Sequence, residues 1–537
     1  MPQLVPQRPP PPDYYAANLR HLFGHVATHH ERLLGAAERR LLAAFAAASV
    51  DAQRLYARLA ARAGPWIRVS SIGYGEVGDV AQALAELMAR RLVRADGQAP
   101  ADELLARLTR AEAGALFPRV RAPTKAAWID ACVGRYPDAQ IRARVAARHP
   151  CVALAEPQAF RACLVLFFGG DGQDLSTYVL QDLGVLRFER YQLDPSRGAF
   201  ADRAELRRYL RCRLASFWSH RLDEVPGLAP VLLDALQDCA GGRTVQRARD
   251  RVLNRLGRWH ERRGEADAAL RCYAVSESHP ARERSARLLR GRGDEAAVAR
   301  LLAEMARDPR APEEADFAAR FGSRRRSTAP PVSWCALPAA TPAAIERHAL
   351  ALLTSNGGRG WHLENLLPLG LAGLVFWDAV FAPVPGAFSH PFQLGPRDLF
   401  WPDFARARRC QIDAQVQALA APGALAAAVR TTAASRRGIA NRLVHWGAFT
   451  SALVDALLDA VPHDALAAIA THTIVNLHRA RTGFPDLLMV YGRDAWELVE
   501  VKGPTDQLQP AQRVWIDTLQ RQGLPVRVLR FRAADRT

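Results

Sequence analysis

Hydrophobic periodicity divides the chain into a long helical part and a short terminal segment that contains strands. From Tyr14 to Leu59 apolar residues recur at intervals of three and four, which predicts a run of helices, and this spacing dominates as far as Ala470. From Asp486 to Phe531 the pattern changes to a strand, a hairpin, a second strand, a helix and a third strand. The pattern predicts a multidomain, mainly α protein with a C-terminal α/β domain.

The length of 537 residues predicts about three or four domains of roughly 150 residues each. Residues 1–12 are proline-rich and are expected to form a flexible tail. Residues 323–331 have the composition of a linker, which indicates a boundary there. We therefore expect an N-terminal binding region over 13–240, a helical-repeat region over 241–330 and one unit over 331–537.

The chain is strongly basic. It has 72 Lys and Arg residues against 54 Asp and Glu residues, a formal charge of +18. This excess favours a polyanionic partner such as nucleic acid. Binding to an acidic membrane surface, or a merely solvated basic surface, would be consistent with the same net charge. No stretch approaches the roughly 20 apolar residues of a membrane helix. We therefore expect a protein without a membrane partner, in the cytoplasm and associated with the nucleoid if bacterial.

A glycine-rich segment near the N-terminus has two interpretations. The run Gly73–Gly78 has the spacing G-x-G-x-x-G and lies between a predicted strand, Trp66–Ile72, and a helix, Val80–Leu92. A dinucleotide-binding unit would use Asp96 as the ribose acceptor. However, helices precede this segment and follow it, where such a unit needs alternating strands and helices. A winged-helix-like module, with Leu92–Arg94 as a second short strand, is therefore favoured.

Lysine occurs only at positions 125 and 502, and this restricts the possible chemistry. A phosphate-binding P-loop needs Gly-Lys-Ser/Thr, which neither position provides, so no nucleotide cofactor is expected. The loop that contains Arg119, Arg121 and Lys125 joins two predicted short helices. We expect it to be either a clamp for DNA phosphates or an ordinary solvated loop.

Residues 245–321 are helical throughout, with breaks about every fifteen to twenty residues, at positions 263–264, 279–280, 291–293 and 308–309. Helix pairs of this size are typical of a tetratricopeptide-like array, which binds or braces. The dense arginines between residues 243 and 263 either line a DNA path or solvate a helix face, and we favour the first.

Three polar residues of the terminal segment form the candidate catalytic site. Asp486 begins one predicted strand, and Glu500 and Lys502 lie fourteen and sixteen residues later on its hairpin partner. Side chains alternate along a strand, so Glu500 and Lys502 share one face while Val499 and Val501 pack on the other. Two neighbouring carboxylates suit Mg²⁺ or Mn²⁺, which activates water and stabilises charge on a phosphodiester. An exposed salt bridge is the common alternative for a Glu-x-Lys pair.

The segments Phe484–Val490, Leu498–Leu508 and Gln512-x-x-Trp515 resemble the VRR-NUC domain, which has a restriction-endonuclease-like core. The wider chain resembles the Fanconi-associated nuclease in its shorter, bacterial form. Gly360–Glu364, followed by Leu374–Asp378, is similar to the family segment that contributes a further acidic ligand, which would be Glu364.

This resemblance implies a winged-helix and SAP-like DNA-binding region, a tetratricopeptide-like bridge and a nuclease core. It implies two Mg²⁺ or Mn²⁺ ions held by Glu364, Asp486, Glu500 and the main-chain carbonyl of Val501, with Lys502 assisting. The implied activity is hydrolysis of phosphodiesters in branched DNA, as a 5′ flap endonuclease and a 5′ to 3′ exonuclease of the phosphodiesterase I type, in interstrand crosslink repair. The residues of this sequence show no counterpart of the ubiquitin-binding zinc finger of longer relatives, so recruitment through ubiquitin is not expected.

The competing hypothesis is a non-catalytic DNA-binding scaffold built from helical repeats. DNA, in the form of 5′ flap or branched substrates, is the expected partner under both, and dimerisation on the substrate is left open. Arg481 is predicted to touch the scissile strand, and Gln512 to reach from its helix toward the site. Asp378 and Asp398 are explained equally well by metal binding and by capping or salt bridges.

Overall fold

The computed structural model describes residues 13–62, 64–95, 97, 99–170, 175, 187–194, 198–321, 330–336, 345–355 and 357–532. These residues form two compact units. The first holds 13–170 and 198–203, and the second holds 187–194 and 204–532, with the gaps just given. The predicted N-terminal tail, Asp96 and most of the predicted linker lie outside the described residues. Within the described part, no helix is long and apolar enough to cross a membrane.

The first unit begins with the predicted run of helices. Its helices are α1 (Tyr14–His29), η1 (Glu31–Leu33), α2 (Ala36–Ala46), α3 (Val50–Ala60), η2 (Val69–Ser71), α4 (Val80–Ala89), α5 (Ala101–Leu105), α6 (Arg110–Leu116), α7 (Lys125–Arg135), α8 (Asp138–Arg148) and α9 (Pro157–Phe168). Several begin at the side-chain caps that such sequences favour, for example Asp79, whose carboxylate accepts a hydrogen bond from the Gln82 N–H at 2.9 Å. The helices α5 to α8 surround an apolar core of their own.

A small antiparallel sheet in the order β1-β3-β2 completes this unit. It consists of β1 (Ile67–Arg68), β2 (Val93–Ala95) and β3 (Cys151–Leu154). The prediction of a strand throughout Trp66–Ile72 is wrong beyond Arg68, because the chain turns there into η2. The expected two strands do not pair with each other, since β3 lies between them. The antiparallel order is that of a winged module, and it lacks the parallel strand-helix-strand unit of a dinucleotide-binding fold.

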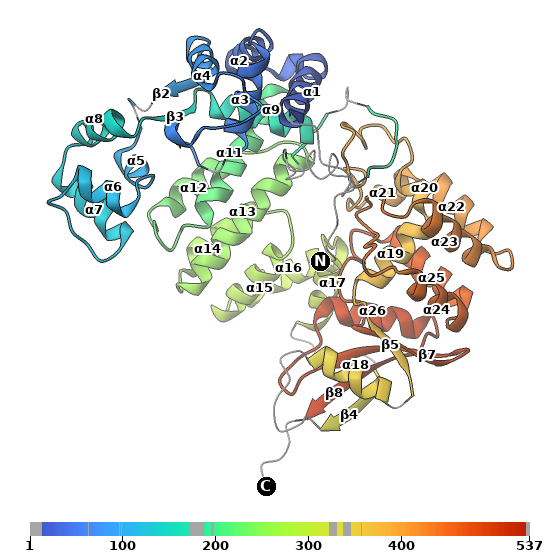
Figure 1. Cartoon of the computed structure of the whole chain (residues 1–537). Helices are drawn as coiled ribbons and strands as arrows, with labels where there is room; N and C mark the ends of the chain where they lie inside the picture. The colour runs from blue at the N-terminus through green and yellow to red at the C-terminus, as the bar shows by residue number, and fades with distance from the viewer. Residues whose placement is uncertain are drawn as a thin grey trace. The chain divides into compact units, whose positions relative to one another are not determined.

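A helical part of the second unit, drawn in green in Figure 1, contains the predicted repeat region of 241–330 and begins before it. Its helices are α11 (Arg203–Ser219), α12 (Leu228–Gln237), α13 (Arg243–Arg262), α14 (Ala266–Val275), α15 (Ala281–Gly291), α16 (Glu295–Arg307) and α17 (Pro312–Arg320). The predicted breaks fall between these helices, except that Gly291 is still the last residue of α15. A Cβ on Gly257 of α13 would lie 2.4 Å from the Tyr273 ring of α14, so this glycine permits the close packing of the first pair.

The C-terminal part of the second unit is built around a five-stranded sheet in the order β4-β8-β7-β6-β5. The strands are β4 (Val332–Ala336), β5 (Arg359–His362), β6 (Leu487–Gly492), β7 (Ala495–Lys502) and β8 (Val526–Arg532). The last three confirm the predicted hairpin and final strand. The first two were not predicted. They extend the sheet at its two edges, with β4 parallel to β8 and β5 antiparallel to β6.

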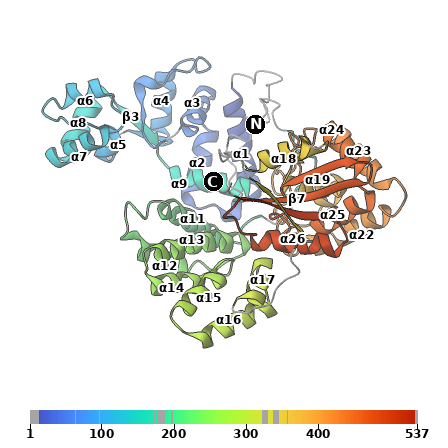
Figure 2. The ribbon, with the colours of Figure 1, turned by 90° about the horizontal axis from the view of Figure 1, so that it is seen from below.

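Helices cover both faces of this sheet, as Figure 2 shows around β7. Helix α18 (Ile345–Ser355) lies on one face, and α19 (Leu366–Val375), α25 (His463–Val475) and α26 (Pro510–Arg521) lie on the other. The other helices of this part are α20 (Trp377–Val380), α21 (Phe404–Ala407), α22 (Arg409–Ala418), α23 (Ala424–Ser435) and α24 (Ser451–Ala460). Val499 and Val501 pack in the cluster that contains α18, whereas Leu498 packs in the larger cluster with α19, α25 and α26. The valines therefore lie on the predicted back face of a central strand. The sequence pattern predicted helix over residues 436–450, and this is wrong, because the chain forms turns there. Gly438 has φ +77°, which a helix does not allow.

Candidate active site

The β6–β7 hairpin places the predicted acidic residues side by side. Leu487 pairs with Val499 across the antiparallel strands, so Asp486 continues the register opposite Glu500. The Val501 N–H donates a hydrogen bond of 2.8 Å to Asp486 Oδ2. This bond fixes the first carboxylate against the strand that bears the second.

Glu500 is a wholly buried carboxylate whose one close partner among the described residues is Lys502. Lys502 Nζ lies 2.6 Å from Glu500 Oε1, and both side chains are at most 9% exposed. Apart from this ion pair, neither Glu500 oxygen has a hydrogen-bond partner among the residues described. Burial, followed by repulsion from Asp486, raises the pKa of Glu500 to about 7, although Lys502 acts in the opposite direction. One ammonium therefore serves two buried neighbouring carboxylates, and ionisation of both stays costly without further positive charge.

Asp486 is perturbed in the same direction. Burial is the largest cause that raises its pKa, and the Val501 hydrogen bond and Lys502 partly offset it. Repulsion from Glu346 and Glu364 adds to the increase. Burial and mutual repulsion both oppose ionisation of the two central carboxylates, and the one neighbouring lysine offsets this only in part.

Glu364 lies at the rim of the site, as the resemblance implies. Strand β5 pairs with β6, and the N–H groups of Leu363 and Glu364 both donate 3.0 Å hydrogen bonds to the Asp486 carbonyl. Glu364 is exposed and has φ +42°, an uncommon backbone conformation for a residue with a side chain. Its Oε1 accepts a hydrogen bond from Asn365 Nδ2 at 2.9 Å. In the described part of the chain, no three His, Cys, Asp or Glu side chains converge at metal-ligand spacing.

Sequence reasoning missed one acidic residue near the site. Glu346 is in the first turn of α18 and contributes to the raised pKa of Asp486. The only signal was an acid at the start of a predicted helix, which is a common position for Glu because of the helix dipole. The approach of α18 to Asp486 depends on the edge strands, which the sequence pattern did not reveal.

The predicted DNA-contacting residues of the first unit lie between α6 and α7. Arg119 and Arg121 are exposed on the connecting loop, and Lys125 is the first residue of α7. Lys125 Nζ donates a 2.7 Å hydrogen bond to the Ala106 carbonyl, which ties α7 to the end of α5. Their contact with DNA stays a prediction.

The two residues of the second unit that are predicted to contact DNA differ in how free their side chains are. Arg481 is exposed, with its guanidinium carbon 5.0 Å from the centre of the Phe400 ring. The side-chain oxygen of Gln512 accepts a 2.8 Å hydrogen bond from the Gln509 N–H and so caps α26. Only the amide donors of Gln512 are left for DNA, and its predicted reach toward the site stays a prediction.

Several other candidates have structural partners. Asp398 pairs with both terminal nitrogens of Arg408, at 2.6 and 3.0 Å, which supports the salt-bridge interpretation over metal binding. In α13, Arg249 is buried beside Asp250 at 3.1 Å, and Arg243 lies 2.5 Å from Asp403. These arginines brace the unit, so the α13 arginines do not all serve as a DNA path.

The central hairpin, its two carboxylates and the adjacent lysine define a nuclease with a restriction-endonuclease-like core. Comparison with known proteins agrees with this class. The model of the VRR-NUC domain matches residues 420–533, which include Asp486, Glu500 and Lys502 but not Glu364. The model described as "FAN1, HTH domain" matches residues 13–94.

The similarity extends along nearly the whole chain. A Fanconi-associated nuclease 1 homolog of Pseudomonas aeruginosa is 29% identical over 97% of this chain and 96% of its own length. A homolog from Arabidopsis thaliana is 27% identical over 98% of this chain and 68% of its own length. A crystal structure of paFAN1, bound to DNA with a 2-nucleotide 5′ flap and a gap, matches with a TM-score of 0.89 and 27% identity. It covers 99% of this chain and all of that one.

These matches confirm the resemblance to Fanconi-associated nucleases and the predicted fold class. The chain is a DNA-hydrolysing nuclease with a VRR-NUC domain and an N-terminal helix-turn-helix domain. The hypothesis of a non-catalytic scaffold has no support in them.

Proposed function

We propose that this nuclease cuts branched DNA at a 5′ flap, as an endonuclease and a 5′ to 3′ exonuclease. The observation that carries the proposal is the wholly buried Glu500 carboxylate, which lies next to Asp486 and beside the single ammonium of Lys502. The similar paFAN1 structures contain 5′ flap DNA, which supports this substrate class. Repair of interstrand crosslinks, in the cytoplasm and at the nucleoid if the source is bacterial, is the proposed cellular role.

The residues present fit a divalent cation. Among the described residues, the two buried Glu500 oxygens have Lys502 as their one close partner, and Asp486 keeps Oδ1 beside the Oδ2 that accepts the Val501 hydrogen bond. Asp486, Glu500 and the Val501 carbonyl would hold Mg²⁺ or Mn²⁺, with Glu364 completing a second ion from the rim. When bound, such an ion lowers the pKa of a water molecule and polarises the phosphodiester.

Lys502 supplies a positive group that the protein itself positions. Its ammonium is buried beside Glu500, and the following turn is held by a 2.9 Å hydrogen bond from the Gly503 N–H to Asp506 Oδ2. A compact ammonium at this place orients the attacking group or neutralises the scissile phosphate. A wide, planar guanidinium would not fit the same buried space equivalently.

The experiment compares cleavage with binding on one substrate. Purified protein with Mn²⁺ should cut a DNA that has a short 5′ flap, and Asp486→Ala and Glu500→Ala should abolish cutting. Both variants should bind the same DNA in EDTA as the parent does. Asp494→Asn is the matched control, because it removes an exposed carboxylate from the turn of the same hairpin at a φ of +58° that Asn tolerates. Cutting by the alanine variants at the parental rate would refute the site.

A further inference from the structure

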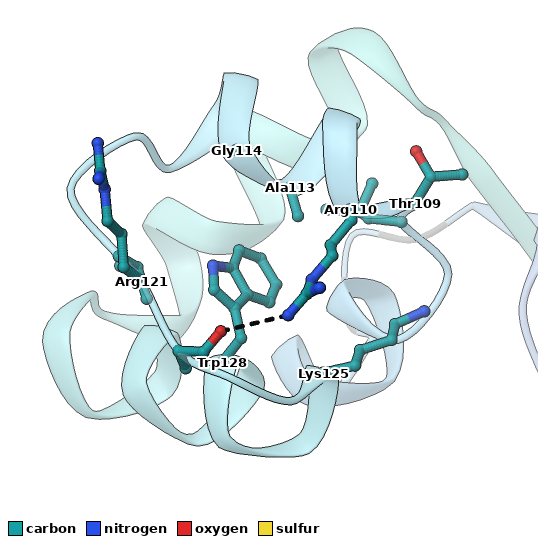
Figure 3. Close-up of a pocket in the computed structure, with 10 residues that line it drawn as sticks. Thr109, Arg110, Ala113, Gly114, Arg121, Lys125 and Trp128 are labelled. Atoms are coloured by element: carbon teal, nitrogen blue, oxygen red, sulfur yellow. Dashed lines mark hydrogen bonds between the residues drawn. The ribbon is translucent and has the colours of Figure 1, made fainter.

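A cavity far from the carboxylates in sequence lies in the first unit, between α6 and the start of α7. It has a volume of about 210 Å³. Its lining is Leu108, Thr109, Arg110, Ala113, Gly114, Val120, Arg121, Ala122, Lys125 and Trp128. Figure 3 shows the Trp128 ring beneath α6, with the Arg110 side chain beside it.

The lining combines an apolar interior with a cationic rim. Val120 and Trp128 are 7% and 8% exposed and form part of one apolar core, whereas Arg110, Arg121 and Lys125 are exposed. No acidic side chain lines the cavity. The nearby Glu112 is held by Arg68 through bonds of 2.7 and 3.0 Å. A ligand with a flat apolar part and an adjoining negative charge matches this arrangement, and a bare phosphate clamp would need no apolar interior.

Hydrogen bonds fix the walls of the cavity but use only some of the donors of its basic side chains. Arg110 donates to the carbonyls of Pro123 at 2.5 Å and Ala122 at 3.5 Å, which fastens the loop to α6. The dashed line in Figure 3 marks the second of these bonds. Arg110 and Lys125 each have further donors, so the walls are fixed before a ligand arrives and the rim keeps its charge.

The volume of the cavity limits which part of a DNA molecule can enter it. Drug-sized ligands occupy pockets of roughly 300–1,000 Å³, so this cavity admits one ring system and little more. A base inside a duplex is stacked on its neighbours and cannot present its faces to such a recess, whereas an unpaired base can. Branched DNA provides unpaired nucleotides next to a charged backbone.

We propose that the α6–α7 cavity receives the base of one unpaired nucleotide of the DNA substrate. Trp128 and Val120 form the apolar walls around the base, and Arg110, Arg121 and Lys125 neutralise the phosphates at the mouth. The cavity thereby distinguishes branched DNA from plain duplex. This inference rests on the proposed action on flap DNA.

Gly114 offers a way to fill the cavity without breaking the helix. It lines the cavity in α6, and a Cβ built on it meets no atom within 4 Å. Leucine at this position projects into the open space, and alanine adds only one carbon. Both favour the helix over glycine, so neither substitution is expected to lower the melting temperature.

The test measures binding of the full chain in EDTA to paired substrates. In each pair one unpaired nucleotide of a 5′ flap DNA either has its base or is abasic, so the phosphates are identical. At one unpaired position of the flap DNA, the parent and Gly114→Ala should bind the DNA that has the base about tenfold more tightly than the abasic DNA, which is ~1.4 kcal/mol. For Gly114→Leu the ratio should fall to about one. Arg121→Ala should weaken both members of the pair and leave the ratio unchanged.

Two results would overturn the inference. One is that the parent binds base-containing and abasic DNA equally at every unpaired position, which would mean that the cavity binds phosphates or a protein segment instead. The other is a parental ratio in Gly114→Leu. Cleavage of the same DNA with Mn²⁺ separates the two proposals, because a parent that cuts but shows no base preference refutes only the cavity assignment.

Discussion

Replacing Glu500 by glutamine should change how the stability of the metal-free protein depends on pH. The ordinary pKa of the side chain is 4.5, and in the folded protein it is raised to about 7, chiefly by burial and then by Asp486. A folded-state pKa above the unfolded one means that the protonated acid stabilises the fold. That stability is complete below pH 4.5 and is lost as the pH rises through 7. The difference corresponds to about 3 kcal/mol.

The assay is thermal unfolding in EDTA at a series of pH values from 4.5 to 8.5. Glutamine approximates the protonated acid. The melting temperature of Glu500→Gln should therefore not fall above pH 5 as that of the parent does. At pH 8 the variant should melt roughly 6 to 12 °C higher, if the nuclease domain has the usual dependence for about 200 residues. Mn²⁺ should raise the melting temperature of the parent more at pH 8 than at pH 5, and that of the variant less.

A second glutamate on the same strand provides the control. Glu497 pairs with Arg527 at 2.7 Å, and hydrogen bonds from Arg527 and Tyr491 outweigh burial and lower its pKa. Its contribution to stability is therefore present above pH 4.5 and is lost only as the pH falls further, so Glu497→Gln should lower stability at pH 8. Parallel pH profiles for the parent and Glu500→Gln between pH 4.5 and 8 would refute the assignment of Glu500 as a buried, destabilised carboxylate.

Three further substitutions test the surroundings of the site. Lys502→Arg should lower the cleavage rate about 10²-fold in a single-turnover assay while binding in EDTA is kept, and full activity would contradict the need for a compact ammonium. Asp398→Ala leaves the fully buried Arg408 unpaired and should cost about 3–5 kcal/mol in denaturant unfolding, against at most about 1 kcal/mol for Asp413→Ala in an exposed pair. Gly483→Ala should lower the melting temperature, because its φ is +91° and its Cβ would lie 2.4 Å from the α26 backbone.

The sequence was sufficient to predict the central hairpin and the pairing of its two carboxylates, because both are encoded locally. Alternation along Ala495–Lys502 gives the strand, and the count of residues back to Asp486 gives the register. The buried valines on the reverse face follow from the same alternation. Glu364 required a resemblance, since nothing in its own surroundings predicts pairing of β5 with a strand more than a hundred residues later.

The elements that escaped prediction are short and depend on distant partners. β3 has four residues and β5 also has four, so neither shows enough alternation to be distinguished from a loop. β4 pairs in parallel with the last strand of the chain, a contact that no local pattern indicates. The same reason explains why Glu346 was missed, because α18 is brought to the site by its packing on β5, β6 and β7.

The burial of Glu500 explains why the site belongs on the central strand of this sheet. An edge strand would leave the carboxylate in water, where hydration competes with a cation and the pKa stays ordinary. On β7, with β6 on one side and β8 on the other, the Val501 N–H is used by Asp486, and among the described residues Glu500 has the Lys502 ammonium as its one close partner. The strand position thus maintains an anion that a divalent cation can stabilise, and the free energy of that cation's binding is set by the same burial that destabilises the metal-free fold above pH 7.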